Sequence, residues 1–446
     1  MRKAINLTKG LNLNLRGGLT DVQPAATVVP QRVAVTPADF PGFTPKLEVA
    51  EGDAVVQGQP LMHDKTYTDI KLTAPTGGVV ESIVRGERRR IERVIIRTSA
   101  EQTAPTIIKA NSGNASSVAS ALKASGLWAM MRQRPYDIVP DPTQTPRDIF
   151  VTAMDTAPLA LNPATVVAGK TAQIEAGVAA LAQLTSGRIY IGVAANSDFP
   201  DIKGCEIVEF TPLHPAGNAG IQAANICPVN KGETVWTLDI TTLAAIGSLM
   251  LSGVADMTVA VAVTGAEVER PQVVTTCPGA DIADIVKGNI KASDIHLRYI
   301  AGNVLTGIPE GLDGYLRYPY RQVTVIPEGD DADEFMGWAS LSPSKMSVSR
   351  SFLGKFLGRK FNPDARINGG RRAMIMSEVY DRYLPMDILP EQLIKAIGAH
   401  DIDKMEALGI YEVAPEDFAL AEYADPSKIE LQKIVREGLD YLRREV

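Results

Sequence analysis

Alternating apolar and polar positions dominate the first hundred residues of the chain. The alternation runs over 45–60 and again over 70–84, and the turn residues Gly52-Asp53 and Pro75–Gly78 separate the short runs. This pattern is typical of short strands joined by tight turns. We therefore expect a small β module over residues 1–100.

The predicted module resembles the biotinyl/lipoyl barrel-sandwich domains. Those domains carry a cofactor on a hairpin lysine, which a methionine flanks in the biotin carriers. Counted back from Ala74-Pro75, the lysine position falls near Tyr67, and Lys65 has no methionine beside it. A biotin or lipoyl carrier stays open as an alternative, but the residues favour a structural barrel-sandwich module.

Strands and helices alternate in the middle of the chain. The sequence predicts a strand over Ile149–Met154, a helix over Thr171–Leu184, and further strands over Gly187–Ala194 and Cys205–Phe210. Such alternation indicates a parallel sheet. No GxGxxG motif follows the first strand, so the dinucleotide-binding fingerprint is missing. We expect a degenerate Rossmann-like domain over residues 101–269.

Two further units complete the predicted α/β multidomain architecture. Residues 270–330 combine a short helix over Gly279–Val286 with two strands, which favours a β-grasp (SLBB-like) module. Residues 331–446 predict a helical C-terminal bundle, because Asp, Glu or Pro stands near the start of each apolar-periodic segment. The helices are expected over Pro390–Ile397, Asp403–Leu408, Pro415–Tyr423 and Pro426–Glu445.

One segment of the C-terminal domain carries a candidate docking face. Phe352, Leu353, Phe356 and Leu357 share one face of a predicted helix, and the basic residues around them fall largely off that face. Such a face can pack into the core, dock on a partner subunit or rest on an anionic membrane. All three roles stay open from the sequence.

A basic run near the end of the β module is a second surface candidate. Residues Arg85–Arg93 contain five arginines, interleaved with Glu87 and Glu92. A solvated hairpin is the simpler interpretation, and a binding patch is the alternative.

Composition limits the chemistry that the chain can carry. The net charge of −7 argues against non-specific nucleic-acid binding. Cys205, Cys227 and Cys277 lie far apart, which excludes a disulfide framework and a cysteine-rich zinc or iron–sulfur motif. The apolar window Thr241–Val254 is too short to span a bilayer and predicts a buried helix. Met1–Gly10 has no apolar stretch of signal-peptide length.

The stretch from Ser125 to Pro140 is the strongest candidate for a functional site. It feeds the βαβ region, where a phosphate-bearing cofactor usually lies against glycine-rich backbone. This stretch has one glycine, and most of its other side chains are bulky or basic. They include Leu127, Trp128, Met130, Met131, Arg132, Arg134 and Tyr136. We therefore expect a filled pocket in place of a phosphate cradle.

Two other polar residues stand where chemistry often occurs. Asp155 ends the first predicted strand of the βαβ region, and His214 begins a Pro/Gly-rich turn. A structural role is expected for each, because no catalytic acid–base pair, nucleophile or metal-ligand set stands out around them.

Several unusual stretches together resemble one family. They are Lys9-Gly-Leu-Asn-Leu13, Phe150–Thr156, His214–Gly217, Ser349–Gly354 and the candidate stretch Ser125–Pro135. In this order they are similar to the A subunits of the bacterial Na+-translocating NADH:quinone reductases, which are related to the C subunit of the Rnf complex and to the FMN-binding subunit of respiratory complex I. The resemblance implies a peripheral subunit on the cytoplasmic side of the inner membrane, partnered by a membrane-embedded subunit.

The cofactor-binding relatives differ from this sequence at three places. Their glycine-rich flavin loop corresponds to Ser125–Tyr136, and their Tyr-Pro-x-Gly-Gly-Glu turn corresponds to His214–Ala219 without the glutamate. Their ferredoxin-type cysteines are missing from Glu422–Ile429, where Ala424 and Asp425 stand. Because an iron–sulfur cluster needs thiolates, we expect neither FMN nor an iron–sulfur cluster on this chain, and NADH and FMN on other subunits.

Two roles are compatible with these residues. The first is quinone binding in the lost flavin pocket, through the seven bulky and basic residues of Leu127–Tyr136, with the two arginines facing a quinone carbonyl. The second is a non-catalytic scaffold that docks on the membrane subunits, since a fold can persist after its chemistry is lost.

Overall fold

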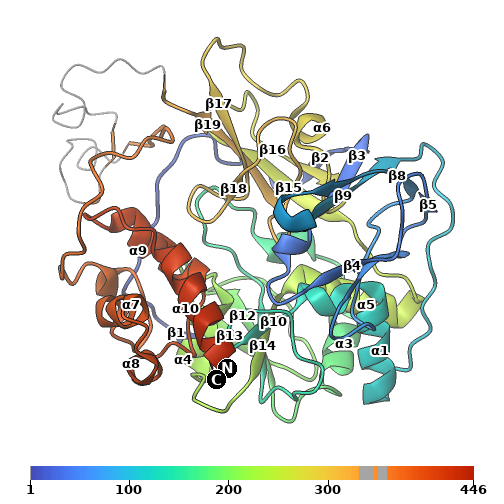
Figure 1. Cartoon of the computed structure of the whole chain (residues 1–446), viewed down its shortest axis with the longest axis horizontal. Helices are drawn as coiled ribbons and strands as arrows, with labels where there is room; N and C mark the ends of the chain where they lie inside the picture. Colours follow the sequence, from blue (N-terminus) through green and yellow to red (C-terminus); the bar gives the residue numbers. More distant parts are fainter. Residues whose placement is uncertain (1, 331–344, 347, 349–358, 446) are drawn as a thin grey trace.

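The computed structural model describes residues 2–330, 345–346, 348 and 359–445 (Figure 1). The described strands form two six-stranded sheets, a four-stranded sheet and a three-stranded sheet. A group of helices near the C-terminus lies on one side of the molecule, opposite the N-terminal β module. Within the described residues, no helix combines the length and the apolar character that crossing a membrane requires.

The N-terminal β module is a sandwich of the two smaller sheets, with strand orders β3-β9-β8-β5 and β4-β6-β7. Its elements are β3 (Arg32–Val35), η1 (Pro37–Asp39), β4 (Pro45–Leu47), β5 (Ala54–Val55), β6 (Pro60–Asp64), β7 (Lys71–Thr73), β8 (Gly78–Arg85), η2 (Glu87–Arg89) and β9 (Ile91–Thr98). Apolar side chains such as Val33, Leu61 and Ile96 are fully buried between the sheets. The alternation over 45–60 and 70–84 therefore predicted the strands from β4 to β8 correctly.

The first thirty residues depart from the prediction of one module over 1–100. Strand β1 (Lys3–Ile5) pairs in parallel with β13 (Glu206–Phe210), and β2 (Pro24–Thr27) pairs in parallel with β16 (Gln272–Thr276). Each short strand completes the edge of a distant sheet, and no local pattern indicates such a partner. The N-terminal segment thus ties the second and third modules together.

The second module is a sheet with the strand order β1-β13-β12-β11-β14-β10. Its remaining elements are α1 (Ala115–Ser125), η3 (Leu127–Met130), β10 (Arg132–Arg134), β11 (Ile149–Thr152), α2 (Pro163–Val166), α3 (Thr171–Leu181), β12 (Ile189–Ala194), α4 (Ala219–Ile226), β14 (Val235–Asp239) and α5 (Ile240–Ser252). The strands β13, β12, β11 and β14 are parallel, and β10 is antiparallel. The chain reverses direction across the sheet between β11 and β14, which is where ligands bind in open α/β sheets.

Helices α3 and α5 pack closely because glycines stand at their contact. A Cβ atom on Gly177 would lie 2.4 Å from the carbonyl oxygen of Leu243, and one on Gly247 would lie 1.7 Å from that of Gln173. Gly247, which interrupts the apolar window, is thus explained by helix packing.

The third module is a mixed sheet with the order β18-β17-β19-β15-β16-β2. Its elements are β15 (Val259–Thr264), β16, α6 (Ile282–Val286), β17 (Leu297–Ala301), β18 (Ile308–Pro309) and β19 (Gln322–Pro327). Strand β15 pairs with β16 and β19, so this module begins before residue 270 and the predicted boundary at 269 is wrong. The boundary was misplaced because a strand that follows a buried helix has the same sequence pattern as a further βαβ unit.

The C-terminal bundle consists of η6 (Tyr380–Arg382), α7 (Pro390–Gly398), α8 (Ile402–Ala407), η7 (Pro415–Phe418), α9 (Ala419–Ala424) and α10 (Leu431–Glu445). Its core includes Leu7 and Phe210 from the edge of the second module, so the bundle packs on that edge. The predicted docking face of Phe352, Leu353, Phe356 and Leu357 lies outside the described residues.

Candidate functional site

Three of the predicted site residues are core residues. Leu127, Trp128 and Met131 are almost completely buried. Trp128 donates its indole N–H to the carbonyl oxygen of Pro140 at 2.9 Å, and its ring meets Trp236 edge-on at 5.1 Å. These side chains fill the space beside the sheet, as the glycine-poor stretch predicted.

Arg134 is held in a buried ion pair between the second module and the C-terminal bundle. Its Nη1 atom lies 2.8 Å from Oδ2 of Asp417 and also donates to the carbonyl oxygen of Glu412 at 2.8 Å. Burial alone would lower the pKa of Arg134, but Asp417 and other nearby carboxylates raise it above its ordinary value. Arg134 is therefore a fixed cation that the protein holds through its Nη atoms, whereas its buried Nε atom has no hydrogen-bond partner among the described residues.

The turn that begins at His214 is closed by neighbouring groups. A Cβ atom on Gly217 would lie 2.6 Å from the backbone nitrogen of Thr156, and one on Gly220 would lie 2.4 Å from the Arg134 guanidinium. The glycines thus allow other protein groups to pack closely against this turn, and they do not form an open cradle of backbone N–H groups for a phosphate. His214 is buried, its Nδ1 lies 3.2 Å from Oγ1 of Thr156, and burial lowers the pKa of His214 to about 4.

The remaining predicted residues lie at the margins of this region. Arg132 donates to the carbonyl oxygens of Asp39 at 2.7 Å and Ala129 at 2.9 Å, and its guanidinium stands 5.5 Å from the ring centre of Tyr318. Tyr136 packs against the core of the C-terminal bundle. The exposed Asp155 accepts a hydrogen bond from the backbone of Ala157 at 2.8 Å.

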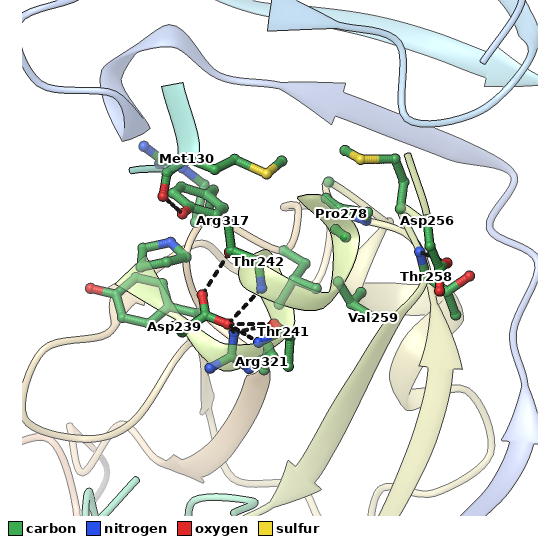
Figure 2. A pocket seen from close by; sticks show the side chains of 17 residues that line it. Met130, Asp239, Thr241, Thr242, Asp256, Thr258, Val259, Pro278, Arg317 and Arg321 are labelled. Carbon is green, nitrogen blue, oxygen red and sulfur yellow. Dashed lines mark hydrogen bonds and ion pairs between the residues drawn. The ribbon is translucent and has the colours of Figure 1, made fainter. Parts of the chain in front are cut away.

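An open cavity lies where the second and third modules meet (Figure 2). Of the seven predicted residues, Met130 lines it. The lining consists of Met130, Asp239, Thr241, Thr242, Ala245, Asp256, Met257, Thr258, Val259, Pro278, Gly279, Leu316, Arg317, Tyr318, Pro319, Tyr320 and Arg321. Most of these residues come from the start of α5 and from the loops before β15 and β19.

A second lobe adjoins this cavity on the side of the N-terminal module. Both lobes are lined by Met130, Met257, Pro278, Gly279, Leu316 and Tyr318. The second lobe adds mainly apolar side chains, among them Val35, Phe40 and Leu72. The two lobes adjoin at these shared residues, and in both of them the lining is more apolar than polar.

Asp239 organises the polar groups of the first lobe, at the switch point of the parallel sheet. It ends β14, and its carboxylate accepts hydrogen bonds from the backbone nitrogens of Thr241 at 2.8 Å and Thr242 at 3.1 Å. Arg321 approaches the same carboxylate to 2.9 Å with its Nη1 atom. Burial raises the pKa of Asp239, but Arg321 and the hydrogen bonds outweigh burial and lower it.

This capping has a chemical consequence. The N-terminus of α5, which in nucleotide-binding folds faces a phosphate, is neutralised here by the protein's own carboxylate. The cavity therefore offers a carboxylate–guanidinium pair and hydroxyl groups instead of an anion cradle. Arg321 lines the cavity while its Nη1 atom is held by Asp239 and Thr241.

Tyr318 and Arg317 join the three modules around the cavity. The Tyr318 hydroxyl donates to the carbonyl oxygen of Met130 at 2.5 Å, and its ring stacks on Phe40 at 5.1 Å. Arg317 donates from Nε to Oδ1 of Asp39 at 2.7 Å. Burial raises the pKa of Tyr318 to about 12, so the phenol stays a hydrogen-bond donor.

These cavity residues were not predicted from the sequence. Asp239, Tyr318 and Arg321 come from distant segments, and no spacing connects them. The helix start Asp239-Ile-Thr-Thr242 was a usable signal, because a capping aspartate at the end of a buried strand marks the carboxyl edge of a parallel sheet.

The loop with Ala424 and Asp425 is closed by the aspartate. The Asp425 carboxylate is fully buried and accepts hydrogen bonds from the backbone nitrogens of Ser427 at 3.0 Å and Ile429 at 2.8 Å. A carboxylate thus organises the turn from within.

Three family models match successive parts of the chain. The NqrA N-terminal barrel-sandwich hybrid domain matches residues 5–99, the NqrA second alpha/beta domain matches 114–255, and the NQRA C-terminal domain matches 260–308. These ranges support the barrel-sandwich module at the N-terminus and an SLBB-like third module.

Similar proteins match the chain from end to end. The A subunit of the Na(+)-translocating NADH-quinone reductase of Pasteurella multocida (strain Pm70) is 35% identical over 448 residues, covering 99% of this chain and 100% of the relative. The protein of the same name from Serratia proteamaculans (strain 568) is 36% identical over 451 residues with the same coverage. A solved chain of the NAD+-reducing NiFe hydrogenase in its H2-reduced state covers 48% of this chain and 47% of its own length, at a TM-score of 0.34 and 11% identity.

Proposed function

The chain belongs to the family of A subunits of the Na(+)-translocating NADH-quinone reductases, and from this membership we propose that it is a peripheral member of such a complex that binds quinone in the two-lobed cavity. In this proposal it lies on the cytoplasmic side of the bacterial inner membrane, against a membrane-embedded subunit. NADH oxidation and flavin chemistry belong to the other subunits, and the chain by itself is not catalytic.

A mostly apolar cavity with a few placed polar groups carries this proposal. A quinone has a flat ring with two carbonyl acceptors and, in most membranes, an apolar tail. Ligand sites for such molecules are mostly apolar, with a few placed polar groups that fix orientation. The first lobe contains the polar side chains of Arg321 and Thr242, and the second lobe contains Val35, Phe40 and Leu72.

The proposed binding mode places the ring beside Met130 and Tyr318, which line both lobes. Arg321 is the donor for one carbonyl oxygen of the quinone. Its ion pair with Asp239 uses the Nη1 atom, so the other N–H groups of the guanidinium serve as donors. The tail extends along the second lobe toward Phe40. Met130 is kept from the sequence-based site, and Arg132 supports the site by holding the Asp39 carbonyl and facing Tyr318.

The same proposal holds that the chain carries neither FMN nor an iron–sulfur cluster. Three contacts support it: Arg134 lies against Gly220, Asp239 caps α5, and the Asp425 carboxylate occupies the turn at Ser427. At these three places the contacts leave no free backbone N–H groups for a flavin phosphate and no thiolates for an iron–sulfur cluster. A flavin band in the absorption spectrum of the purified chain, together with stoichiometric phosphorus in its elemental analysis, would contradict the proposal.

Quinone affinity of the full-length chain tests the site. Arg321→Gln removes the cationic donor and should weaken binding of a short-chain ubiquinone analogue about tenfold, the typical worth of one charge-assisted hydrogen bond. Arg188→Gln is the matched control, because Arg188 is exposed just before β12 and pairs with Glu206. Unchanged affinity in Arg321→Gln, with normal thermal unfolding, would remove the site from this cavity.

A scaffold role is the second candidate function, and the exchange of edge strands favours it. Strands β1 and β2 complete sheets of two other modules, and Arg317 ties the first module to the third. A chain interlocked in this way is suited to hold neighbouring subunits in place. Changing Phe352 and Phe356 to serine should release the chain from the complex if the predicted face docks there. Retention of the doubly changed chain in the purified complex would exclude docking through that face.

A further inference from the structure

The hairpin between β8 and β9 ends in a cluster of arginines. Strand β8 ends at Arg85 and β9 begins at Ile91, and the turn between them contains Arg88, Arg89 and Arg90. All four arginines are exposed, whereas Ile91 is buried. We call Arg85, Arg88, Arg89 and Arg90 the arginine tip.

The arginines at the base of the hairpin are paired, in contrast to the tip. Arg93 approaches Oε2 of Glu310 to 3.4 Å and stands 5.7 Å from the ring centre of Tyr315. Arg32 on the neighbouring strand pairs with Glu81 at 2.6 Å. These contacts attach the base of the hairpin to the third module and to its own sheet.

The tip arginines make few contacts with the part of the chain that the structure describes. Arg85 donates from Nη1 to the carbonyl oxygen of Arg89 at 3.4 Å. Across residues 2–330, 345–346, 348 and 359–445, no ion pair to a carboxylate is formed by Arg88, Arg89 or Arg90. The four tip arginines outnumber the two exposed glutamates beside them, Glu87 and Glu92, so the tip presents a net positive charge to solvent on a chain whose net charge is −7.

The backbone of the tip is one that arginine does not favour. Arg88 has φ of 53° and Arg89 has φ of 60°, and both values lie in the left-handed region. A non-glycine residue there costs about 1–2 kcal/mol, and glycine or asparagine would adopt it more easily. The left-handed turn thus does not explain why arginine stands at these positions, whereas a role for its positive charge does.

We propose that the arginine tip is a contact site for anionic phospholipid headgroups. A guanidinium group binds a phosphate with two parallel hydrogen bonds. A projecting hairpin meets a flat membrane with its tip first, and charges more than about 8 Å away are largely screened at physiological salt. The acidic remainder of the chain therefore does not cancel the attraction, although it would repel a long nucleic acid that wraps the surface.

The side chains around the tip define the kind of contact. Val84 is half-buried and Ile91 is buried in the module, so no large apolar side chain of the turn is available to enter the hydrocarbon layer. Binding is therefore an electrostatic contact at headgroup level, which salt weakens strongly. It goes beyond quinone binding, because the cavity and the tip share no residue.

Cosedimentation of the full-length chain with vesicles tests the proposal. The wild type should bind phosphatidylglycerol-containing vesicles, ignore pure phosphatidylcholine, and dissociate when salt rises from about 0.05 M to about 0.5 M. Replacing Arg88, Arg89 and Arg90 by asparagine keeps the left-handed backbone and should reduce partitioning about 100-fold. The matching triple lysine variant should bind as the wild type does, because it keeps the charge.

A control variant removes three exposed cations elsewhere, through Arg188→Ser, Lys231→Ser and Lys404→Ser, and should leave vesicle binding intact. Equal binding of the asparagine variant and the wild type would overturn the proposal. A second outcome would also overturn it: the wild type does not bind anionic vesicles, and the asparagine variant fails to assemble with the membrane subunits. The arginine tip would then bind an acidic protein segment and not a lipid headgroup. Quinone affinity, measured on the same variants, reports separately on the cavity.

Discussion

The guanidinium group of Arg134 lies against Gly220, in the first turn of α4. A Cβ atom on Gly220 would stand 2.4 Å from Cζ, Nη1 and Nη2 of Arg134. Arg134 comes from the stretch predicted to have lost a cofactor, and Gly220 comes from the glycine turn after β13. The two candidate segments therefore contact one another directly, and the Arg134 guanidinium occupies the space that a Cβ atom on Gly220 would need.

This contact predicts that Gly220→Ala is destabilising. The added methyl group must displace a guanidinium that Asp417 and Glu412 hold in place. Overpacking of this kind costs about 1–3 kcal/mol, and urea unfolding of the full chain measures it. Gly398→Ala is the control, because a Cβ atom there meets open space at the end of α7. Equal stability of the two variants would show that Arg134 moves freely.

The buried pair of Arg134 and Asp417 predicts strong energetic coupling. Removing one partner leaves a buried charge unpaired, which costs about 3–5 kcal/mol. Arg134→Met alone should therefore be strongly destabilising, and the combination of Arg134→Met with Asp417→Asn should recover a large part of the loss. A double-mutant cycle from chemical unfolding measures the coupling. Additive effects of the two substitutions would contradict a direct pair.

Local patterns predicted the elements of this chain and failed at the contacts between modules. The helix over Thr171–Leu184 and the strand over Gly187–Ala194 were predicted from periodicity. Each element buries apolar side chains, and their regular spacing can be seen within the segment itself. The pairing of β1 with β13 was missed, because a three-residue edge strand carries no information about its partner.

The same distinction holds for the candidate site. Trp128 was expected in a filled pocket, and its burial confirms that the pocket is filled, because bulky residues in place of glycines are a local signal. The cavity residues Asp239, Tyr318 and Arg321 converge through the packing of the third module on the second. Such convergence depends on tertiary structure and leaves no motif in the sequence.

His214 predicts a specific pH dependence of stability. Burial lowers the pKa of His214 from 6.5 to about 4, so the folded chain binds its proton more weakly than the unfolded chain does. The stabilisation is fully present above pH 6.5 and is lost as pH falls toward 4. The full shift corresponds to about 3 kcal/mol, at about 1.4 kcal/mol for each pH unit.

Replacing His214 by glutamine should remove this component, while an acceptor for Thr156 is kept. The free energy of unfolding, measured from about pH 7 to about pH 4, should fall less steeply in the variant than in the wild type. His400→Gln is the control, because His400 is exposed and contacts the ring of Tyr441. Identical slopes in the wild type and His214→Gln would mean that His214 titrates normally in the folded chain.

Tyr318 allows the hydrogen bond and the ring packing at the centre of the cavity to be separated. Tyr318→Phe keeps the stacking on Phe40 and leaves the carbonyl oxygen of Met130 without its phenol donor. An unsatisfied buried acceptor costs about 1–3 kcal/mol, whereas Tyr318→Ala also removes the ring and should cost about 3–5 kcal/mol.

Chemical unfolding gives both values, and quinone affinity then assigns the role of each part. If the ring forms one wall of the binding site, Tyr318→Phe should bind quinone nearly as well as the wild type, and Tyr318→Ala should bind it at least tenfold more weakly. A loss of similar size in both variants would instead make the hydroxyl group a direct partner of the quinone. Full binding by Tyr318→Ala would exclude this wall from the site, because both lobes share the Tyr318 side chain.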